Sequence, residues 1–325
     1  LGNKNNEIGV PLTLFELHAH HKAAVIELGM NHPGEIAQLA QAALAQVALV
    51  NNAQREHQEF MQSVAAVAEE NGAAIKALAA DGIAVYPADC EYTPMWSEFA
   101  GTRRSLQFGV SEAATMRILQ QKAQGSTQQL QLRLSEHMLS IDLPLMGQHN
   151  ALNALAAASC CYAIGVSLTS IRAGLETFKA VNGRLQVKLS RKACHLIDDS
   201  YNANPDSVRA AIDVLAPARA AILVLGDMGE VGEQGAEFHA EIGTYAKQQG
   251  IARVLALGPL SAHTVQAFGA GAQHFSDLAS LLIALDEEVQ AHHTVLVKGS
   301  RFMKMERVIA HLVATDQTTQ QQGNH

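Results

Sequence analysis

Polar side chains that could form a binding site are concentrated between residues 195 and 212. This stretch predicts a short apolar strand from Cys194 to Ile197, then a polar loop, then a helix. Asn204 can cap that helix, and Pro205 suits its first turn, where the missing N–H is not needed. The loop offers more side-chain donors and acceptors than a helix cap needs: Asp198, Asp199, Tyr201, Asn202 and Asn204. Because open α/β sheets bind ligands at the carboxyl ends of their strands, we favour a binding site over an ordinary capped turn.

Two later apolar runs are also followed directly by polar residues. Residues 224–232 pass from a predicted strand into glycines and acids, and the helix expected after them carries His239. The other run leads to Lys298, Ser300 and Arg301. A glycine-rich loop alone is a weak signal, and this one lacks the GxGxxG dinucleotide pattern. Three strand ends with complementary polar groups nevertheless predict one shared site, since the carboxyl ends of parallel strands meet at the same edge of a sheet.

The first half of the chain offers a separate set of candidates. Glu27 and His57 each follow a predicted strand, as an acid and an imidazole could when they share a divalent cation, although each alone is more often a surface or capping residue. Asn150 and Asn153 stand at a predicted helix start, where capping competes with recognition of a purine edge. The histidine cluster at 18–21 is better explained as a polar helix face, because no acid or cysteine at ligand spacing supports a metal site.

The composition bounds the class of protein. The chain has 325 residues, enough for two domains, and its 48% hydrophobic and 17% charged content is that of a soluble globular protein. The formal net charge of −8 disfavours a nucleic acid or an anionic membrane as a partner. No apolar run approaches the roughly 18 residues that span a bilayer. The four cysteines lack CxxC spacing, so we expect reduced core residues in a cytoplasmic protein.

Strands and helices alternate up to residue 86 and again after residue 193, which predicts parallel βα units in an α/β fold. The strands expected there are 23–28, 46–50, 82–86, 194–197, 220–225, 252–257 and 294–297. The helices expected along the chain include 12–21, 35–45, 61–78, 147–162, 170–179 and 303–313. Runs of period two at 105–109, 116–120, 129–134 and 137–143 indicate antiparallel strands of a smaller appended sheet. A linker at 180–184 would separate domains at 1–181 and 182–315, followed by a disordered tail at 316–325.

Several stretches together resemble the Mur ligases, a family of ATP-dependent amide ligases. The matching runs are residues 2–11 (GNKNNEIGVP), 27–35 (ELGMNHPGE), 147–153 (GQHNALN), 183–184 (GR), 198–206 (DDSYNANPD), 225–230 (LGDMGE) and 298–301 (KGSR). They follow the family's order across nearly the whole chain, and the first, fifth and sixth are specific to the members that add D-alanyl-D-alanine to UDP-N-acetylmuramoyl-tripeptide. The resemblance therefore implies a central ATPase domain with a parallel sheet, followed by a Rossmann-like C-terminal domain, in an enzyme of peptidoglycan precursor synthesis.

In that family, ATP phosphorylates the terminal carboxylate of the nucleotide-linked peptide, and the amine of D-alanyl-D-alanine attacks the acyl phosphate. The resemblance assigns Glu27 and His57 to Mg²⁺, Asn150 and Asn153 to the adenine, Arg184 to the ATP phosphates and Asp199 to the ribose. Along the nucleotide it places Tyr201, Asn202, Asn204 and Pro205. On the dipeptide side it places Lys298, Ser300 and Arg301, and the catalytic groups would be Lys298, Arg184 and His57. We expect a monomer.

Two departures from the family pattern limit the expected activity. The chain opens on Leu1 and contains no GxxxxGK[ST] phosphate loop. We therefore expect an interior piece of a longer protein, inactive alone, with the UDP-sugar domain and the phosphate loop before Leu1. Many members also carry a carbamylated lysine in the helix after the metal histidine, where this chain has Glu69 and Glu70 as candidates for the missing negative charge.

Two alternatives remain open at this point. Another amide ligase of the superfamily, such as a folylpolyglutamate synthase, is disfavoured by the DDSYNANPDS run at 198–207. From a different class, the chain could be a non-catalytic module that retains only a nucleotide or partner surface.

Overall fold

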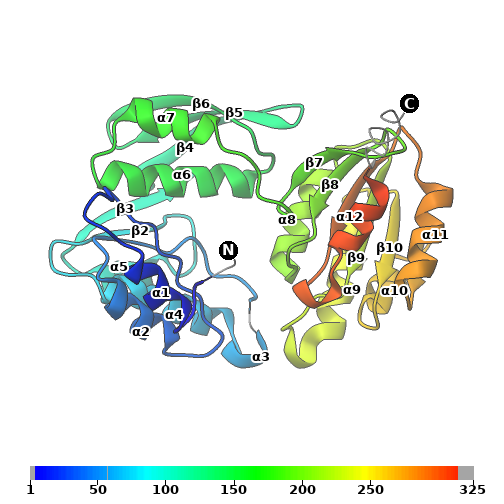
Figure 1. The fold of residues 1–325 in the computed structure, drawn as a ribbon, viewed down its shortest axis with the longest axis horizontal. Coiled ribbons are helices and arrows are strands. Elements are labelled where there is room, and N and C mark those ends of the chain that lie inside the picture. The colour runs from blue at the N-terminus through cyan, green and yellow to red at the C-terminus, as the bar shows by residue number, and fades with distance from the viewer. Residues whose placement is uncertain (1–3, 57, 314–325) are drawn as a thin grey trace, which may run out of the picture. The chain divides into compact units, whose positions relative to one another are not determined.

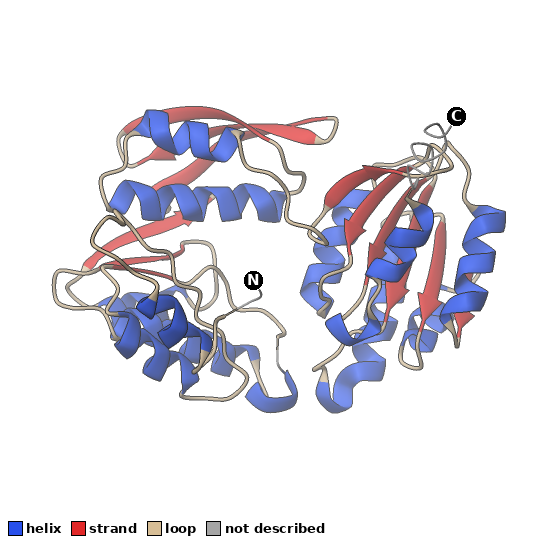
Figure 2. Cartoon of the chain, in the orientation of Figure 1, coloured by secondary structure: helices blue, strands red, loops and turns tan. Residues whose placement is uncertain are grey.

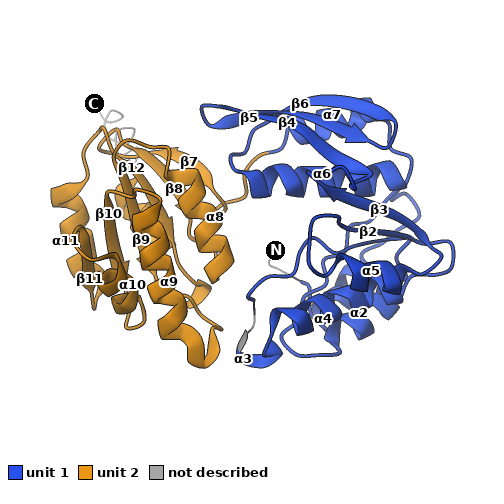
Figure 3. Ribbon diagram, turned by 180° about the vertical axis from the view of Figure 1, so that it is seen from behind, with its two compact units in different colours: residues 1–178 blue, residues 179–325 orange. Residues whose placement is uncertain are grey.

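The structure, a computed structural model, describes residues 4–56 and 58–313. The chain divides into two compact units, Leu1–Phe178 and Lys179–His325, and each unit contains one six-stranded sheet (Figure 3). The predicted metal ligand His57 and the predicted tail at 316–325 lie outside the described residues. Within the described ranges, no helix is both long and apolar enough to cross a membrane.

The sheet of unit 1 (residues 1–178) places its strands side by side in chain order (Figure 1). They are β1 (Val47–Leu49), β2 (Ile83–Pro87), β3 (Arg104–Gly109), β4 (Met116–Gln124), β5 (Thr127–Leu134) and β6 (His137–Leu143). Strands β1 to β4 pair in parallel, and β4 to β6 pair as antiparallel hairpins. The predicted antiparallel strands are therefore present, but they continue the parallel sheet instead of forming an appended one.

The assignment of residues 105–109 to the antiparallel strands was wrong, because β3 pairs in parallel with both of its neighbours. Parallel neighbours need a crossover connection, and α5 (Thr93–Ala100) supplies it between β2 and β3. The sequence pattern did not reveal this short helix, which has Pro94 in its first turn. Its Trp96 is fully buried, and the indole Nε1 donates a hydrogen bond to the Ala68 carbonyl at 2.8 Å.

Helices cover both faces of the unit 1 sheet (Figure 2). Besides α5 they are α1 (Gly9–Phe15), α2 (Glu35–Ala43), α3 (Gln58–Met61), α4 (Val64–Lys76), α6 (Gln148–Ala163) and α7 (Leu168–Glu176). Successive residues of a strand point to opposite faces, so that Val85 packs in a core with α6 and β3 to β6, whereas Tyr86 packs with Trp96 and the residues of α4.

The prediction of a strand at 23–28 was wrong. Residues 23–30 have no regular secondary structure, and Val25 is 96% exposed. An apolar segment becomes a strand only where a neighbour pairs its backbone, and among the described residues β1 pairs with β2 alone. The helix expected at 12–21 is only partly present. α1 begins at Gly9, where the Asn6 side chain accepts a hydrogen bond from the Gly9 N–H at 2.8 Å, and it ends at Phe15. The histidine cluster at 18–21, expected on a polar helix face, therefore lies outside a helix.

The sheet of unit 2 (residues 179–325) has the strand order β11-β10-β9-β12-β8-β7. These strands are β7 (Gln186–Leu189), β8 (His195–Asp199), β9 (Ala221–Gly226), β10 (Arg253–Leu257), β11 (Ala272–Phe275) and β12 (Thr294–Lys298). β7 pairs antiparallel with β8, and the other pairs are parallel. The sequence pattern did not reveal β7 and β11, which are short and partly exposed.

The helices of unit 2 lie on both faces of its sheet, which is the Rossmann-like arrangement (Figure 2). They are α8 (Pro205–Leu215), α9 (Gly235–Gln248), α10 (Ser261–Phe268), α11 (Leu278–Glu288) and α12 (Glu306–Leu312), with 3₁₀ turns at Gly232–Gln234 and Arg301–Met303. From β7 to β11 each new strand is added farther along the sheet in one direction. The chain then returns and places β12 between β8 and β9, so the strand order reverses at this point. In such sheets the crevice beyond the carboxyl ends of the strands at this reversal is where ligands bind.

Candidate functional site

The structure brings the carboxyl ends of β8, β12 and β9 to one edge of the unit 2 sheet, as the sequence predicted. In the parallel register, Lys298 lies opposite Asp199 of β8 and opposite Leu225 of β9. The polar loops that follow these strands are therefore neighbours. The side chains of Lys298 and Ser300 join them to one another.

Lys298 forms a buried ion pair with Asp199. The ammonium Nζ lies 2.6 Å from the Asp199 Oδ2 and 2.8 Å from the Asn202 carbonyl oxygen, and the two charged side chains are 5% and 13% exposed. The second oxygen of Asp199 accepts a hydrogen bond from the Leu185 N–H at 3.1 Å. The carboxylate is thus held in one orientation, and the charges interact where solvent screens them little.

Ser300 is the second residue that joins the loops. Its hydroxyl donates a hydrogen bond to the Ala203 carbonyl at 3.0 Å and accepts one from the Gly229 N–H at 2.5 Å. Its own N–H donates to the Asp227 carbonyl at 3.0 Å. Because Ser300 is only 3% exposed, these contacts fix its side chain as a structural element of the edge. None of these contacts tests the predicted role of Ser300 in binding the dipeptide, which stays a prediction.

Two guanidinium groups lie near the ring of Tyr201, which is 37% exposed. Arg184 lies 4.6 Å from the ring centroid and Arg301 lies 6.0 Å from it. Gly183, with φ +74°, lets its backbone lie close to the backbone of Tyr201, because a Cβ there would lie 3.1 Å from the Tyr201 nitrogen. An aromatic ring can stack on a planar group, and cations close to it can bind an anion, which is the chemistry that a nucleotide requires.

Asn204 and Pro205 begin α8 as predicted. The Asn204 side chain accepts a hydrogen bond from the Ser207 N–H at 2.7 Å, while the Ser207 hydroxyl accepts one from the Asn204 N–H at 3.0 Å. This reciprocal capping box accounts for the Asn204 side chain without a ligand. Asn202 uses its side-chain oxygen to accept from the Ala203 N–H at 2.9 Å. The nucleotide roles of these residues stay predictions.

Asp227 is a structural centre of this edge that the sequence pattern did not reveal. Its carboxylate is buried and accepts hydrogen bonds from the Leu260 and Ser261 N–H groups at 3.2 and 2.7 Å, at the start of α10. The buried His239 of α9 reaches the same loop. The glycine and acid run at 224–232 was the available signal for both residues, but the run does not reveal which helices come back to it.

In unit 1, hydrogen bonds join two of the candidates to other parts of the chain. Glu27 accepts a hydrogen bond from the Asn5 side-chain amide at 3.1 Å. Asn153 of α6 accepts one from the Asn51 amide at 2.8 Å, so the loop after β1 meets the start of α6. The Asn150 amide donates to the Met146 carbonyl at 2.8 Å, which satisfies one of its donors locally. The described residues contain no group of three or more potential metal ligands.

The structure assigns separate roles to the glutamates proposed to replace the carbamylated lysine. Both carboxylate oxygens of Glu70 accept hydrogen bonds at 2.8 Å, from the Gly34 and Ile36 N–H groups at the start of α2. Glu69 lies at the surface with one oxygen 3.7 Å from the Lys76 ammonium. Glu70 is therefore explained as a buried support for α2, and the geometry gives no indication of metal binding by either glutamate.

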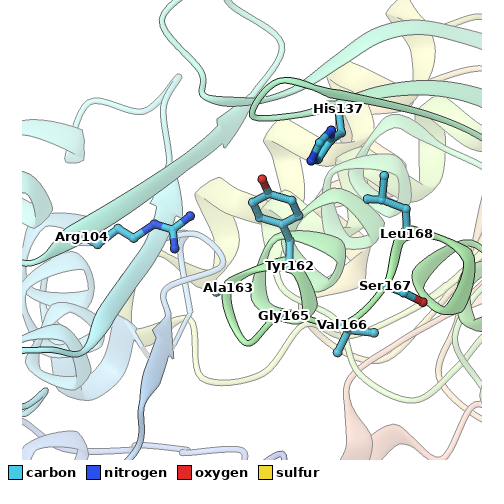
Figure 4. Close-up of a pocket in the computed structure, with 8 residues that line it drawn as sticks. All are labelled: Arg104, His137, Tyr162, Ala163, Gly165, Val166, Ser167 and Leu168. Atoms are coloured by element: carbon cyan, nitrogen blue, oxygen red, sulfur yellow. The ribbon is translucent and has the colours of Figure 1, made fainter.

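Unit 1 also contains a pocket of about 430 Å³ where α6 ends and α7 begins (Figure 4). The residues that line it are Arg104, His137, Tyr162, Ala163, Gly165, Val166, Ser167 and Leu168. Beside the pocket, the carboxylate of Glu136 lies 3.6 Å from the His137 Nε2. None of the residues predicted to bind the nucleotide, metal or dipeptide lines this pocket.

The fold and the two family models agree. Residues 1–161 match the Mur ligase middle domain, and residues 183–301 match the domain described as Mur ligase, glutamate ligase domain. The chain therefore belongs to the Mur ligase family.

Within this family, two curated relatives carry the same name. The UDP-N-acetylmuramoyl-tripeptide--D-alanyl-D-alanine ligase of Escherichia coli is 40% identical over 314 residues, which cover 95% of this chain and 69% of the relative. The ligase of that name from Haemophilus influenzae is 38% identical over 315 residues, covering 95% and 68%.

The solved structures agree with this result. MurF from Acinetobacter baumannii superimposes with a TM-score of 0.90 at 30% identity, covering 95% of this chain and 69% of that one. MurF ligase from Thermotoga maritima in complex with ADP has a TM-score of 0.85 at 25% identity, covering 96% and 71%. A folylpolyglutamate synthase from Mycobacterium tuberculosis shares the fold at 20% identity with a TM-score of 0.69.

Proposed function

We propose that this protein is an ATP-dependent amide ligase that joins D-alanyl-D-alanine to UDP-N-acetylmuramoyl-tripeptide. The observation that carries the proposal is the 40% identity, over 95% of the chain, with the Escherichia coli ligase of that name. The site supports it, because the edge of the unit 2 sheet combines cations, an aromatic face and a fixed carboxylate as a nucleotide-dependent ligase requires. The folylpolyglutamate synthase alternative has a likeness of fold only.

The reaction has two steps, a phosphoryl transfer and then an acyl transfer. A carboxylate oxygen of the tripeptide attacks the terminal phosphorus of ATP, the bond to the bridging oxygen breaks, and ADP leaves. The dipeptide amine then attacks the acyl carbon, loses a proton and expels inorganic phosphate. Both steps concentrate negative charge on phosphoryl oxygens, so positioned cations lower their barriers. We assign this role to Arg184, and we assign Lys298 to the acceptor side with Ser300 and Arg301.

For the nucleotide, we assign Asn150 and Asn153 to the adenine and Asp199 to the ribose. Tyr201, Asn202, Asn204 and Pro205 would line the nucleotide. Asp199 suits a ribose because its orientation is fixed by Lys298 and the Leu185 N–H. The Tyr201 ring offers a face for stacking.

Magnesium fits the residues of unit 1. The ion commonly binds through one or two carboxylates together with water and substrate phosphates. Glu27 lies on an exposed loop and supplies such a carboxylate, and His57 is the second proposed ligand. When bound, Mg²⁺ neutralises charge on the transferred phosphoryl group.

The 325 residues contain no GxxxxGK[ST] phosphate loop. We propose that turnover requires such a loop, and that the chain without it binds nucleotide but does not hydrolyse it. We further propose that the protein acts as a monomer in the cytoplasm, which size-exclusion chromatography with light scattering and cell fractionation would test.

The experiment is phosphate release from ATP and Mg²⁺ with both substrates present. It compares the 325-residue chain with the same chain joined to the phosphate-loop segment of the Escherichia coli ligase. Product formation by the joined chain alone supports both the ligase and the need for the loop. Turnover with glutamate and a folate, but not with D-alanyl-D-alanine, would contradict the proposed substrates, and nucleotide binding without any turnover would favour a non-catalytic module.

A further inference from the structure

His239 is a buried group that the proposed roles do not use. It lies on α9 and is fully buried. Its Nδ1 is 2.7 Å from the Gly235 carbonyl oxygen, and its Nε2 is 3.0 Å from the Met228 N–H nitrogen. A carbonyl oxygen only accepts hydrogen bonds, and a backbone N–H only donates them. The imidazole must therefore be neutral, with its proton on Nδ1.

The loop that His239 contacts, Gly226–Glu230, is held from several directions. The Asp227 carboxylate binds the first N–H groups of α10, and the Gly229 N–H donates to the Ser300 hydroxyl. The Ser300 N–H donates to the Asp227 carbonyl. The loop backbone is thus fixed beside the segment assigned to the dipeptide, and the contact with His239 sits between the two attachments to Ser300.

The contact with His239 differs from the others because an imidazole ordinarily changes its protonation between pH 5 and 8. Protonation of Nε2 would turn the acceptor into a donor that faces the Met228 N–H, and the hydrogen bond would be lost. We propose that His239 is a positioning residue, which in its neutral form holds the Gly226–Glu230 loop beside Ser300 for dipeptide binding and on protonation releases it. The dipeptide part rests on the proposed function.

The surroundings of His239 set the direction of its titration. Burial lowers the pKa of His239, while the hydrogen bond to Gly235 and the carboxylate of Asp227, 4.0 Å away, oppose this and the nearby His263 of α10 adds to it. Because the folded pKa lies below the ordinary value of 6.5, the unfolded chain takes up the proton first as the pH falls. Stability from His239 is therefore complete above about pH 6.5 and is lost below it.

Two substitutions separate the contacts of His239. In His239→Asn the amide nitrogen takes the place of Nδ1, so the donor to Gly235 is kept and the acceptor for Met228 is lost. In His239→Gln the amide oxygen takes the place of Nε2, so the acceptor for Met228 is kept and cannot be protonated. The matched control is His263→Gln, which removes the exposed neighbouring imidazole.

The measurement is hydrogen exchange of the Met228 and Gly229 amides in the whole chain, followed from pH 7.5 down through the acid range in which the protein stays folded and corrected for the intrinsic rates. We expect strong protection at pH 7.5 in the native protein and in His239→Gln, and at least a tenfold loss in His239→Asn. At a pH below 6.5 the native protein loses protection that His239→Gln keeps. Equal protection in the Asn and Gln variants, or the same pH profile in the native protein and in His239→Gln, would overturn the role. If His239→Asn does not fold, the pH comparison on the native protein decides.

Dipeptide binding, followed by ligand-observed NMR with D-alanyl-D-alanine, tests the second part. We expect binding at least threefold weaker in His239→Asn than in His239→Gln at pH 7.5. Equal binding in both, with a difference in exchange, would restrict His239 to loop structure and overturn its substrate role. No binding by the native chain would count against the assignment of Ser300 under the proposed function, while the exchange result would still decide the role of His239 in the loop.

Discussion

Replacing Lys298 by Met should destabilise unit 2 strongly. The substitution keeps an apolar side chain of similar length but removes the cation that lies 2.6 Å from Asp199. Removing one partner of a buried ion pair costs about 3–5 kcal/mol, because the remaining charge is left without compensation. Asp199 is 13% exposed and keeps its hydrogen bond from the Leu185 N–H, which places the expected loss near the lower end, at about 3 kcal/mol.

The double variant Lys298→Met with Asp199→Asn separates charge from packing. It removes both charges and retains a hydrogen-bonding group for the Leu185 N–H. Since the cost of the single variant arises from an orphaned carboxylate, we expect the double variant to return to within about 1.5 kcal/mol of the native protein. The same-type control is Lys247→Met, on an exposed surface of unit 2, with an expected change below about 0.5 kcal/mol.

The assay is urea unfolding followed by far-UV circular dichroism and by tryptophan fluorescence. Trp96 is the only tryptophan in the sequence and is buried in unit 1, so its fluorescence reports that unit. Lys298→Met should lower the urea concentration at which unit 2 unfolds, as followed by dichroism, and should leave the midpoint of the fluorescence transition unchanged. A loss below about 1 kcal/mol, or a double variant as unstable as the single one, would refute the argument that an uncompensated charge determines the cost.

Three further predictions concern packing and reactivity. Gly243→Ala should cost about 3 kcal/mol in unit 2, because the new Cβ would lie 2.2 Å from the Thr264 carbonyl oxygen where α9 meets α10, and circular dichroism would measure it. Arg103→Ala should cost about 2–3 kcal/mol in unit 1, seen by fluorescence, because its guanidinium donates to carbonyl groups that follow α4 and end α5. Cys160 should resist iodoacetamide at pH 8, since burial raises the pKa of its thiol to about 12, whereas mass spectrometry should find the label on Cys90 first.

Each of these has a control or a contradicting result. Gly174 lies on α7 with open space around its Cβ position, so Gly174→Ala should be neutral or slightly stabilising, and equal losses at the two glycines would contradict the steric argument. For Arg103, a substitution to Lys that preserves full stability would show that charge, not the fork of donors, is what matters. For Cys160, rapid labelling in the native protein with no rise on denaturation would contradict its burial.

The elements that the sequence predicted well are those determined by local chemistry. The capping box and Pro205 set the start of α8 within a few residues, so the sequence was sufficient there. The buried strands of unit 2 read as continuous apolar runs because both faces of the sheet are covered. The failures were nonlocal: the apolar segment at 23–28 lacks a paired neighbour, and β3 is parallel because a helix connects it to β2.

The same division holds for the candidate site. The sequence by itself determined which residues stand at the carboxyl ends of β8, β9 and β12, because the positions along the chain of these strands and of the polar loops after them follow from the apolar pattern. Only the tertiary structure decided which of them contact each other. The pairing of Lys298 with Asp199, the bridging position of Ser300 and the contact of His239 with the Met228 N–H join residues far apart in the chain. Such contacts depend on the register of neighbouring strands and on which helix covers each loop, and no local sequence pattern encodes either one.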